Sequence, residues 1–171
     1  ESLIRQYLDF GCDKIGVVES DKGMKSAGLS NAFQNPCVKI IENPSPEAGR
    51  FLSIKLGLKA LGVDCPVFMQ NVDNPFAQRE VLENLRSNLE GHDFARPVFS
   101  GKGGHPVFLN PNVIIQVLKH PSLDLNFKHF LGSFHGEQVR VEDDRILINV
   151  NTPEAYERFL KRDENSKGVH H

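Results

Sequence analysis

Short apolar segments alternate with segments of helical periodicity along this chain, and this alternation restricts the fold more than any other feature. Apolar runs of four or five residues are followed by stretches in which apolar side chains recur every three or four positions. Strands that alternate with helices in this way form βαβ units, whose strands lie parallel in a sheet with helices on both faces. The sequence therefore predicts a three-layer α/β/α domain with a mainly parallel, Rossmann-like sheet.

The alternation extends over nearly the whole chain, so one domain accounts for it. A chain of 171 residues is long enough for a single domain with its own apolar core. We expect the domain to span residues 1–162 and a polar tail, residues 163–171, to end in the remnant of a purification tag. The expected strands are 14–18, 38–41, 66–69, 94–99, 106–109, 139–141 and 146–149, and the expected helices are 2–10, 25–33, 46–61, 77–89, 112–118, 126–131 and 152–162.

The composition excludes several classes of partner. The formal net charge is −2 with acidic and basic residues interspersed, so the chain has no broad basic face for nucleic acid, although a small anionic ligand stays compatible with it. No apolar run reaches the roughly 18 residues of a membrane span, and no signal peptide is visible. Cys12, Cys37 and Cys65 are widely spaced, which indicates buried free thiols in a cytoplasmic protein.

Asp73 is the first candidate for a functional residue. Parallel sheets bind ligands beyond the carboxyl ends of their strands, and Asp73 follows the apolar strand expected at 66–69. Its carboxylate suits Mg²⁺, which takes oxygen ligands from one or two carboxylates, substrate phosphates and water. An aspartate that bonds a backbone N–H of its own turn is the alternative interpretation.

A second candidate segment joins the last expected strand to the last expected helix. Asn149 and Asn151 offer amide oxygens to a cation or a ribose, and amide N–H groups to a phosphate. Asn151 or Thr152 also suits the N-cap of the helix that begins with Pro153. A cap at one of these positions is compatible with a ligand role for Asn149.

The glycine-rich loop 101–106 is a third candidate. Lys102 supplies a positive charge, Gly104 permits close approach of the backbone to a ligand, and His105 can hydrogen-bond a phosphate. A histidine that only orders its own loop is an equally good interpretation. The loop does not have the spacing of a Walker motif.

Arg50, at the helix start that follows Asn43, is a fourth candidate because its guanidinium can clamp a phosphate. An ordinary solvent-exposed helix start explains it as well. The sequence contains no nucleophile elbow, no HExxH and no zinc-spaced set of cysteine and histidine.

Taken together, these segments resemble the MobA/MocA-like nucleotidyltransferases, a family with a GT-A-type α/β fold. Residues 148–154 are similar to the NxNTPE signature that precedes the family's last helix, and residues 67–75 are similar to its strand and DxP-type turn. Residues 104–107 resemble its GHPV segment. Residues 42–53, with Asn43, Arg50 and Ser53, resemble the segment before the helix that lines its nucleotide site.

The resemblance implies nucleotidyl transfer, in which an acceptor phosphate attacks the α-phosphorus of a nucleoside triphosphate (NTP) and pyrophosphate leaves. It implies that Asp73, Asn149 and Asn151 are catalytic, with Asp73 and Asn149 holding Mg²⁺. The residues expected to contact nucleotide or acceptor are Asn43, Arg50, Ser53, Lys102, Gly104 and His105. A molybdopterin-type acceptor is favoured. A sugar- or polyol-phosphate transferase and a non-catalytic nucleotide-binding or regulatory relative stay open, as do CTP or GTP as the nucleotide and an oligomeric state.

The sequence departs from this family at its start. The family begins with a strand and a nucleotide-binding loop of the LAAGxSxRMG type, whereas Glu1 already falls in the helix that follows that loop. That strand is central in the family's sheet, so its loss would leave apolar edges unpaired. We therefore expect the natural protein to have this segment, which is either cut off, supplied by a partner's strand or absent from this sequence. We also expect residues 1–162 alone to have little or no transferase activity.

Overall fold

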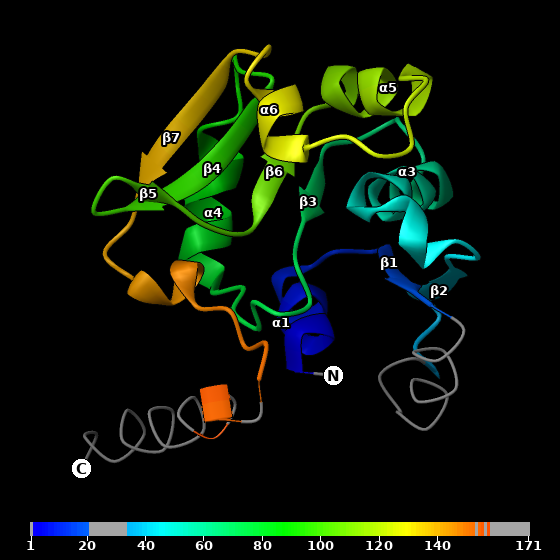
Figure 1. Cartoon of the computed structure of the whole chain (residues 1–171). Helices are drawn as coiled ribbons and strands as arrows, with labels where there is room; N and C mark the ends of the chain where they lie inside the picture. Colours follow the sequence, from blue (N-terminus) through cyan, green and yellow to red (C-terminus); the bar gives the residue numbers. More distant parts are fainter. Residues whose placement is uncertain (1, 21–33, 153, 156, 158–171) are drawn as a thin grey trace.

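The computed structural model describes residues 2–20, 34–152, 154, 155 and 157 (Figure 1). The helix predicted at 25–33 and the tail at 163–171 lie outside these residues. In the described part, two sets of strands pair. The strands are β1 (Ile15–Glu19), β2 (Val38–Glu42), β3 (Val67–Met69), β4 (Phe94–Phe99), β5 (Lys102–Gly103), β6 (Val107–Leu109) and β7 (Gly136–Arg140).

The strands form a two-stranded sheet and a five-stranded sheet in the described residues. β1 pairs with β2, and the larger sheet has the order β3-β6-β4-β5 with β7 also paired to β4. The two pairings of five residues, β1 with β2 and β4 with β7, are parallel. The shorter pairings of β6 with β3 and β4, and of β5 with β4, are antiparallel. The predicted α/β class is confirmed, with an antiparallel part around β6.

Several helix ends coincide with capping residues of the sequence. The helices are α1 (Ser2–Phe10), α3 (Arg50–Leu61), α4 (Arg79–Ser87), α5 (Pro111–Lys119) and α6 (Phe127–Leu131), with 3-10 turns η2 (Pro46–Ala48) and η3 (Asp144–Leu147). Gly11, with φ of 103°, and Gly62, with φ of 93°, follow α1 and α3 in a conformation that favours glycine. The Asn110 side chain accepts a hydrogen bond from the Val113 N–H at the start of α5. Every helix of the described residues is too short to span a bilayer.

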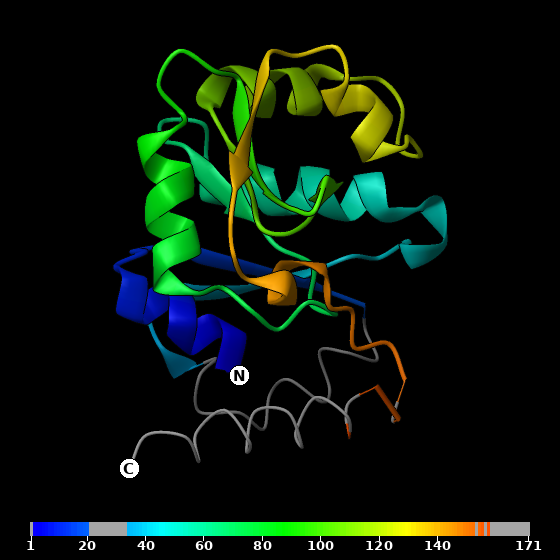
Figure 2. The same cartoon turned by 90° about the vertical axis from the view of Figure 1, so that its left-hand side faces the viewer.

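Helices cover both faces of the larger sheet, which gives the three predicted layers (Figure 2). On one face, Val81 and Leu85 of α4 pack against Ala95 of β4 and Phe108 of β6. On the other face, α3, α5 and α6 enclose a second core around Phe51. The helix α1 lies over β3, where Tyr7 and Phe10 contact the Phe68 ring. Because helices cover the faces of the sheet, the loops at the ends of the strands are the places where a site can form.

Two sequence-based expectations are wrong in detail. The strand expected at 146–149 is instead the 3-10 turn η3 with an extended segment after it. The carbonyl oxygens of Ile146 and Ile148 accept hydrogen bonds from the Asn74 side chain, and this side chain takes the place of a neighbouring strand. The three cysteines are free as expected, but they are not buried: Cys65 is exposed and the other two are partly exposed.

Candidate active site

Three loops of the described chain meet beyond the carboxyl end of β3. They are the turn at 70–75, the loop before β6 that contains His105, and the segment from η3 to Asn151. The Ile146 carbonyl oxygen accepts from the His105 backbone N–H at 3.1 Å, and the Val150 N–H donates to the Asp73 carbonyl oxygen at 2.5 Å. These bonds bring Asp73, His105 and the Asn149–Asn151 segment to the same end of the sheet.

The Asp73 side chain is partly buried, and its Oδ1 atom is inaccessible to solvent without a hydrogen-bond partner in the described residues. A buried carboxylate oxygen without a partner is destabilising, and such atoms in native proteins usually receive a ligand, an ion or a water. Asn149 and Asn151, on either side of Val150, are exposed. One buried acceptor and two exposed amides therefore lie around the same turn.

Arg50, Asn71 and His105 form a chain of polar contacts next to Asp73. The Arg50 guanidinium donates to Oδ1 of Asn71. The Asn71 Nδ2 atom lies 3.0 Å from Nε2 of His105, and because Nδ2 can only donate, Nε2 accepts. The neutral His105 ring therefore has its proton on Nδ1, which is buried, and the ring lies within hydrogen-bonding reach of the Met69 backbone.

Burial is the largest cause that lowers the pKa of His105 below its ordinary value, followed by the positive charge of Arg50; the carboxylate of Asp73 acts in the opposite direction. The unfolded chain therefore binds more protons than the folded chain between the two pKa values. We expect the contribution of His105 to stability to be complete above pH about 6.5 and to be lost as the pH falls through the folded pKa. An NMR titration of the ring C–H signals tests this, with the exposed His129 as reference. A folded pKa of His105 at or above its ordinary value would contradict it.

The remaining predicted contact residues have different surroundings. Asn43 is buried: its Nδ2 atom donates to Ser53 Oγ at 2.9 Å, and its Oδ1 atom accepts from the Ser45 N–H at 2.9 Å. Asn43 and Ser53 thus connect the end of β2 to α3, and contact with a ligand stays a prediction for both. Lys102 is exposed in β5, and no contact joins it to Asp73 or His105 among the described residues.

Gly104 allows the His105 loop to lie directly against Ile146 of η3. A Cβ atom at this position would lie 2.4 Å from the Ile146 carbonyl oxygen and 2.8 Å from the Ile146 side chain. Any other residue would push η3 away from the His105 loop. The glycine expected to approach a ligand therefore permits two of the three loops to meet, and a contact between Gly104 and a ligand stays a prediction.

A family model described as the MobA-like NTP transferase domain matches residues 1–138. The chain belongs to this family. The match includes the Asp73 turn and the His105 loop but ends before η3. The Asn149–Asn151 segment therefore lies outside the match, and the hydrogen bond from Val150 to Asp73 is what connects it to the site. A search of curated proteins gave no match.

Solved structures share the fold of this MobA-like chain at low sequence identity. Rv0371c of Mycobacterium tuberculosis in complex with manganese has a TM-score of 0.72 and 15% identity, covering 93% of this chain and 86% of its own. Molybdopterin-guanine dinucleotide biosynthesis protein A of Archaeoglobus fulgidus has a TM-score of 0.63 and 20% identity, covering 95% and 86%. The 4-diphosphocytidyl-2C-methyl-D-erythritol synthase of Anaerococcus prevotii has a TM-score of 0.69 and 13% identity, covering 93% and 89%.

The oxygen-bearing side chains of the candidate site suit a hard divalent cation that takes some ligands from the protein and others from a substrate. The described residues contain no group of three histidine, cysteine or acidic side chains that would enclose a metal. Asp73, Asn149 and Asn151 instead lie near one turn, and their side chains carry oxygens of the kind that a hard cation takes. Mg²⁺ and similar ions bind in this way, completing their shell with phosphates and water.

Sequence reasoning missed Asn71 and Asn74 as members of the site. Asn71 orients His105, and Asn74 connects the turn to the segment after η3. A signal was present, because the run from Gln70 to Asn74 has four polar residues directly after an apolar strand. Polar residues are also common in ordinary turns, so this run did not stand out.

Proposed function

We propose that this protein, when it carries the N-terminal nucleotide-binding segment of its family, binds an NTP together with Mg²⁺ beyond the end of β3 and transfers the nucleotidyl group to a small phosphorylated acceptor. A phosphate oxygen of the acceptor forms a bond to the α-phosphorus, and the bond from this phosphorus to the pyrophosphate oxygen breaks. One observation carries the proposal: the buried Oδ1 of Asp73 has no hydrogen-bond partner among the described residues, while the Asp73 carbonyl oxygen accepts from the Val150 N–H at 2.5 Å.

The proposed roles follow from the groups that each side chain presents. Asp73 and Asn149 would hold the cation, which supplies charge neutralisation to phosphate oxygens when bound. Asn151 would hydrogen-bond the substrate near this ion. Arg50 would contact a phosphate through the guanidinium nitrogens that do not bond Asn71, and His105, which Asn71 orients, would contact the substrate. No protein nucleophile is required, because alignment and charge neutralisation supply most of the catalysis in such transfers.

For the acceptor, we favour a molybdopterin-type phosphate, with GTP or CTP as nucleotide. Support comes from the family match and from the fold shared with the molybdopterin-guanine dinucleotide biosynthesis protein. A polyol phosphate is the second candidate, since the methylerythritol synthase shares the fold at a higher TM-score of 0.69. We place the activity in the cytoplasm, as the free and widely spaced cysteines favour a reducing compartment.

Binding of NTP in the presence of a divalent cation tests this proposal. We expect CTP or GTP to bind only when Mg²⁺ or Mn²⁺ is present, and Asp73→Asn to weaken the binding of Mn²⁺ about 10- to 100-fold, because it removes the one charged ligand. Free Mn²⁺ can be counted by electron paramagnetic resonance during a titration with protein and nucleotide. Asp64→Asn, which makes the same change at an exposed carboxylate, is the matched control.

Acceptor profiling then separates the candidate reactions. Pyrophosphate release with a molybdopterin phosphate and not with polyol or sugar phosphates supports the first candidate, and the reverse supports the second. In a chain that carries the N-terminal segment, cation-dependent NTP binding without release for any acceptor would identify a non-catalytic relative. Equal Mn²⁺ affinity for the parent and Asp73→Asn would remove the basis of the proposal.

A further inference from the structure

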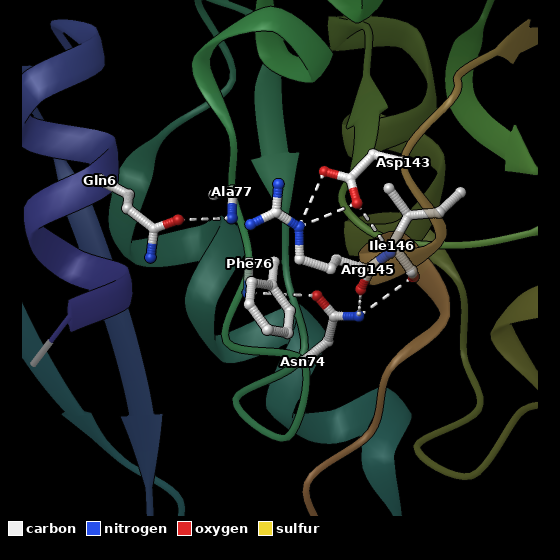
Figure 3. A network of polar contacts seen from close by, with 7 residues as sticks. All are labelled: Gln6, Asn74, Phe76, Ala77, Asp143, Arg145 and Ile146. Carbon is white, nitrogen blue, oxygen red and sulfur yellow. Dashed lines mark hydrogen bonds and ion pairs between the residues drawn. The ribbon is translucent and has the colours of Figure 1, made fainter. Parts of the chain in front are cut away.

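The side-chain amide of Asn74 is buried between the Asp73 turn and the segment after η3 (Figure 3). Its Nδ2 atom donates to the carbonyl oxygens of Ile148 at 2.8 Å and Ile146 at 3.0 Å, and it lies 3.3 Å from that of Arg145. The residue is 0% exposed, so no water competes for these bonds. One amide therefore bonds carbonyls of both η3 and the residue after it, which have no neighbouring strand in the described residues.

The orientation of this amide is fixed from its other side. Oδ1 of Asn74 accepts from Gln70 Nε2 at 2.8 Å, and the Phe76 N–H lies 3.4 Å away. Oε1 of Gln70 in turn accepts from the Tyr7 hydroxyl of α1 at 3.0 Å. Because Oδ1 is occupied by donors, Nδ2 must point to the η3 segment, and a flipped amide would place two acceptors together.

A second contact of α1 holds the same turn. The Gln6 side chain accepts from the Ala77 N–H at 2.8 Å (Figure 3). It also donates to the Pro75 carbonyl oxygen at 3.0 Å. On the other side of Asn74, Arg145 forms an ion pair with Asp143 at 2.9 Å, next to the start of η3. The turn and the η3 segment are thus each held by their own neighbours, and the Asn74 amide connects them together with the backbone bond from Val150 to Asp73.

The Ile146 carbonyl oxygen is where the third loop joins. It accepts from Asn74 Nδ2 at 3.0 Å and also from the His105 backbone N–H at 3.1 Å. Gly104 lies against the same carbonyl, with room for no Cβ atom. A displacement of this oxygen would therefore move His105 relative to Asp73.

We propose that Asn74 is a positioning residue, whose amide sets the placement of the Asp73 turn, the His105 loop and the Asn149–Asn151 segment relative to one another. What the positioned groups then do rests on the proposed function, whereas the coupling of the three loops does not. Asn74 contacts backbone carbonyls and Gln70, and it acts on a substrate only through the residues it places.

Asn74→Asp is the decisive variant, because it keeps the shape and the accepting Oδ1 atom and replaces the donor with a second oxygen that faces carbonyl oxygens. We expect amide hydrogen exchange at Val150 and His105 to become about 10- to 100-fold faster, since both amides bond across the junction. The Asn43 amide, which donates to Glu19 at 2.8 Å in the other sheet, should keep its rate. Mn²⁺ affinity should fall about 10-fold in parallel.

Two further variants test whether the effect of Asn74→Asp comes from the added charge or from the displaced Ile146 carbonyl. Asn126→Asp introduces the same charge at an exposed N-cap whose oxygen only accepts, from the His129 N–H at 3.1 Å, and should change neither readout. Gly104→Ala displaces the Ile146 carbonyl from the opposite side and should accelerate exchange at the same two amides. Unchanged exchange at Val150 and His105 in Asn74→Asp would overturn the proposal. So would a uniform acceleration or loss of the fold in Asn74→Asp and Gly104→Ala, which would make the junction a general structural element.

The same experiment separates failure of this inference from failure of the proposed function. A parent chain that binds no Mn²⁺ removes the basis of the transferase proposal, while the exchange rates of the two amides still decide the role of Asn74. Conversely, unchanged exchange in a variant of a cation-binding parent rejects the positioning role alone.

Discussion

Replacing Phe51 with alanine should lower the free energy of unfolding by about 3–5 kcal/mol. The Phe51 ring is 0% exposed at the start of α3 and contacts the rings of His120, Phe127 and Phe130 at centroid distances of 5.6, 6.4 and 5.7 Å. Truncation removes a large apolar surface and leaves a cavity between α3, α5 and α6, which the surrounding helices fill only in part. For a domain of this size, the loss corresponds to a melting temperature lower by roughly 6–20 °C.

Thermal and urea unfolding followed by circular dichroism measure this effect. Leu123→Ala is the matched control, because Leu123 is 48% exposed and its truncation should change stability by no more than about 0.5 kcal/mol. A loss below about 1 kcal/mol in Phe51→Ala would show that the core around α3 is not packed as described. Since Arg50 directly precedes Phe51, we also expect the variant to bind nucleotide more weakly near its melting temperature.

The sequence predicted the elements best where local signals and burial agree. The strand at β4 and the helix α5 are apolar on the faces they bury, and α5 begins with an asparagine cap followed by proline. The segment 146–149 is equally apolar, yet it forms η3 and an extended stretch, because its carbonyls bond an asparagine distant in sequence. No local pattern contains the information that Asn74 would lie there.

The candidate site likewise contains residues that the sequence indicates and contacts that only the fold creates. Asp73 and His105 are recognisable from their position beside apolar strands, since the ends of neighbouring strands meet at one edge of a sheet. The Asn43–Ser53 hydrogen bond and the contact of Gly104 with Ile146 depend on which atoms the fold brings together, so the sequence did not predict these protein partners. Ligand contacts of the same residues stay predictions. The Asn71 relay to His105 likewise joins positions 34 residues apart.

The second large effect is expected for Arg50→Met, which should weaken NTP binding about 10- to 100-fold. This substitution keeps much of the apolar stem of the side chain and removes the guanidinium that donates to Asn71 Oδ1. Two consequences follow: the proposed phosphate contact is lost, and the Asn71 amide is no longer held with its Nδ2 toward His105. The pKa of His105 should rise toward its ordinary value, because the charge of Arg50 is one of the causes that lower it.

Isothermal titration with CTP or GTP and Mn²⁺ measures the first effect, and an NMR titration of His105 measures the second without any substrate. Lys59→Met is the matched control, since Lys59 is an exposed cation in the last turn of the same helix. Its removal changes the net charge equally and should leave both readouts near those of the parent, because the charge is exposed and screened by salt. A raised His105 pKa with unchanged NTP affinity in Arg50→Met would support the polar contacts from Arg50 through Asn71 to His105 and reject the contact of Arg50 with a phosphate. An unchanged pKa of His105 in Arg50→Met would reject the polar contacts that connect Arg50 to His105.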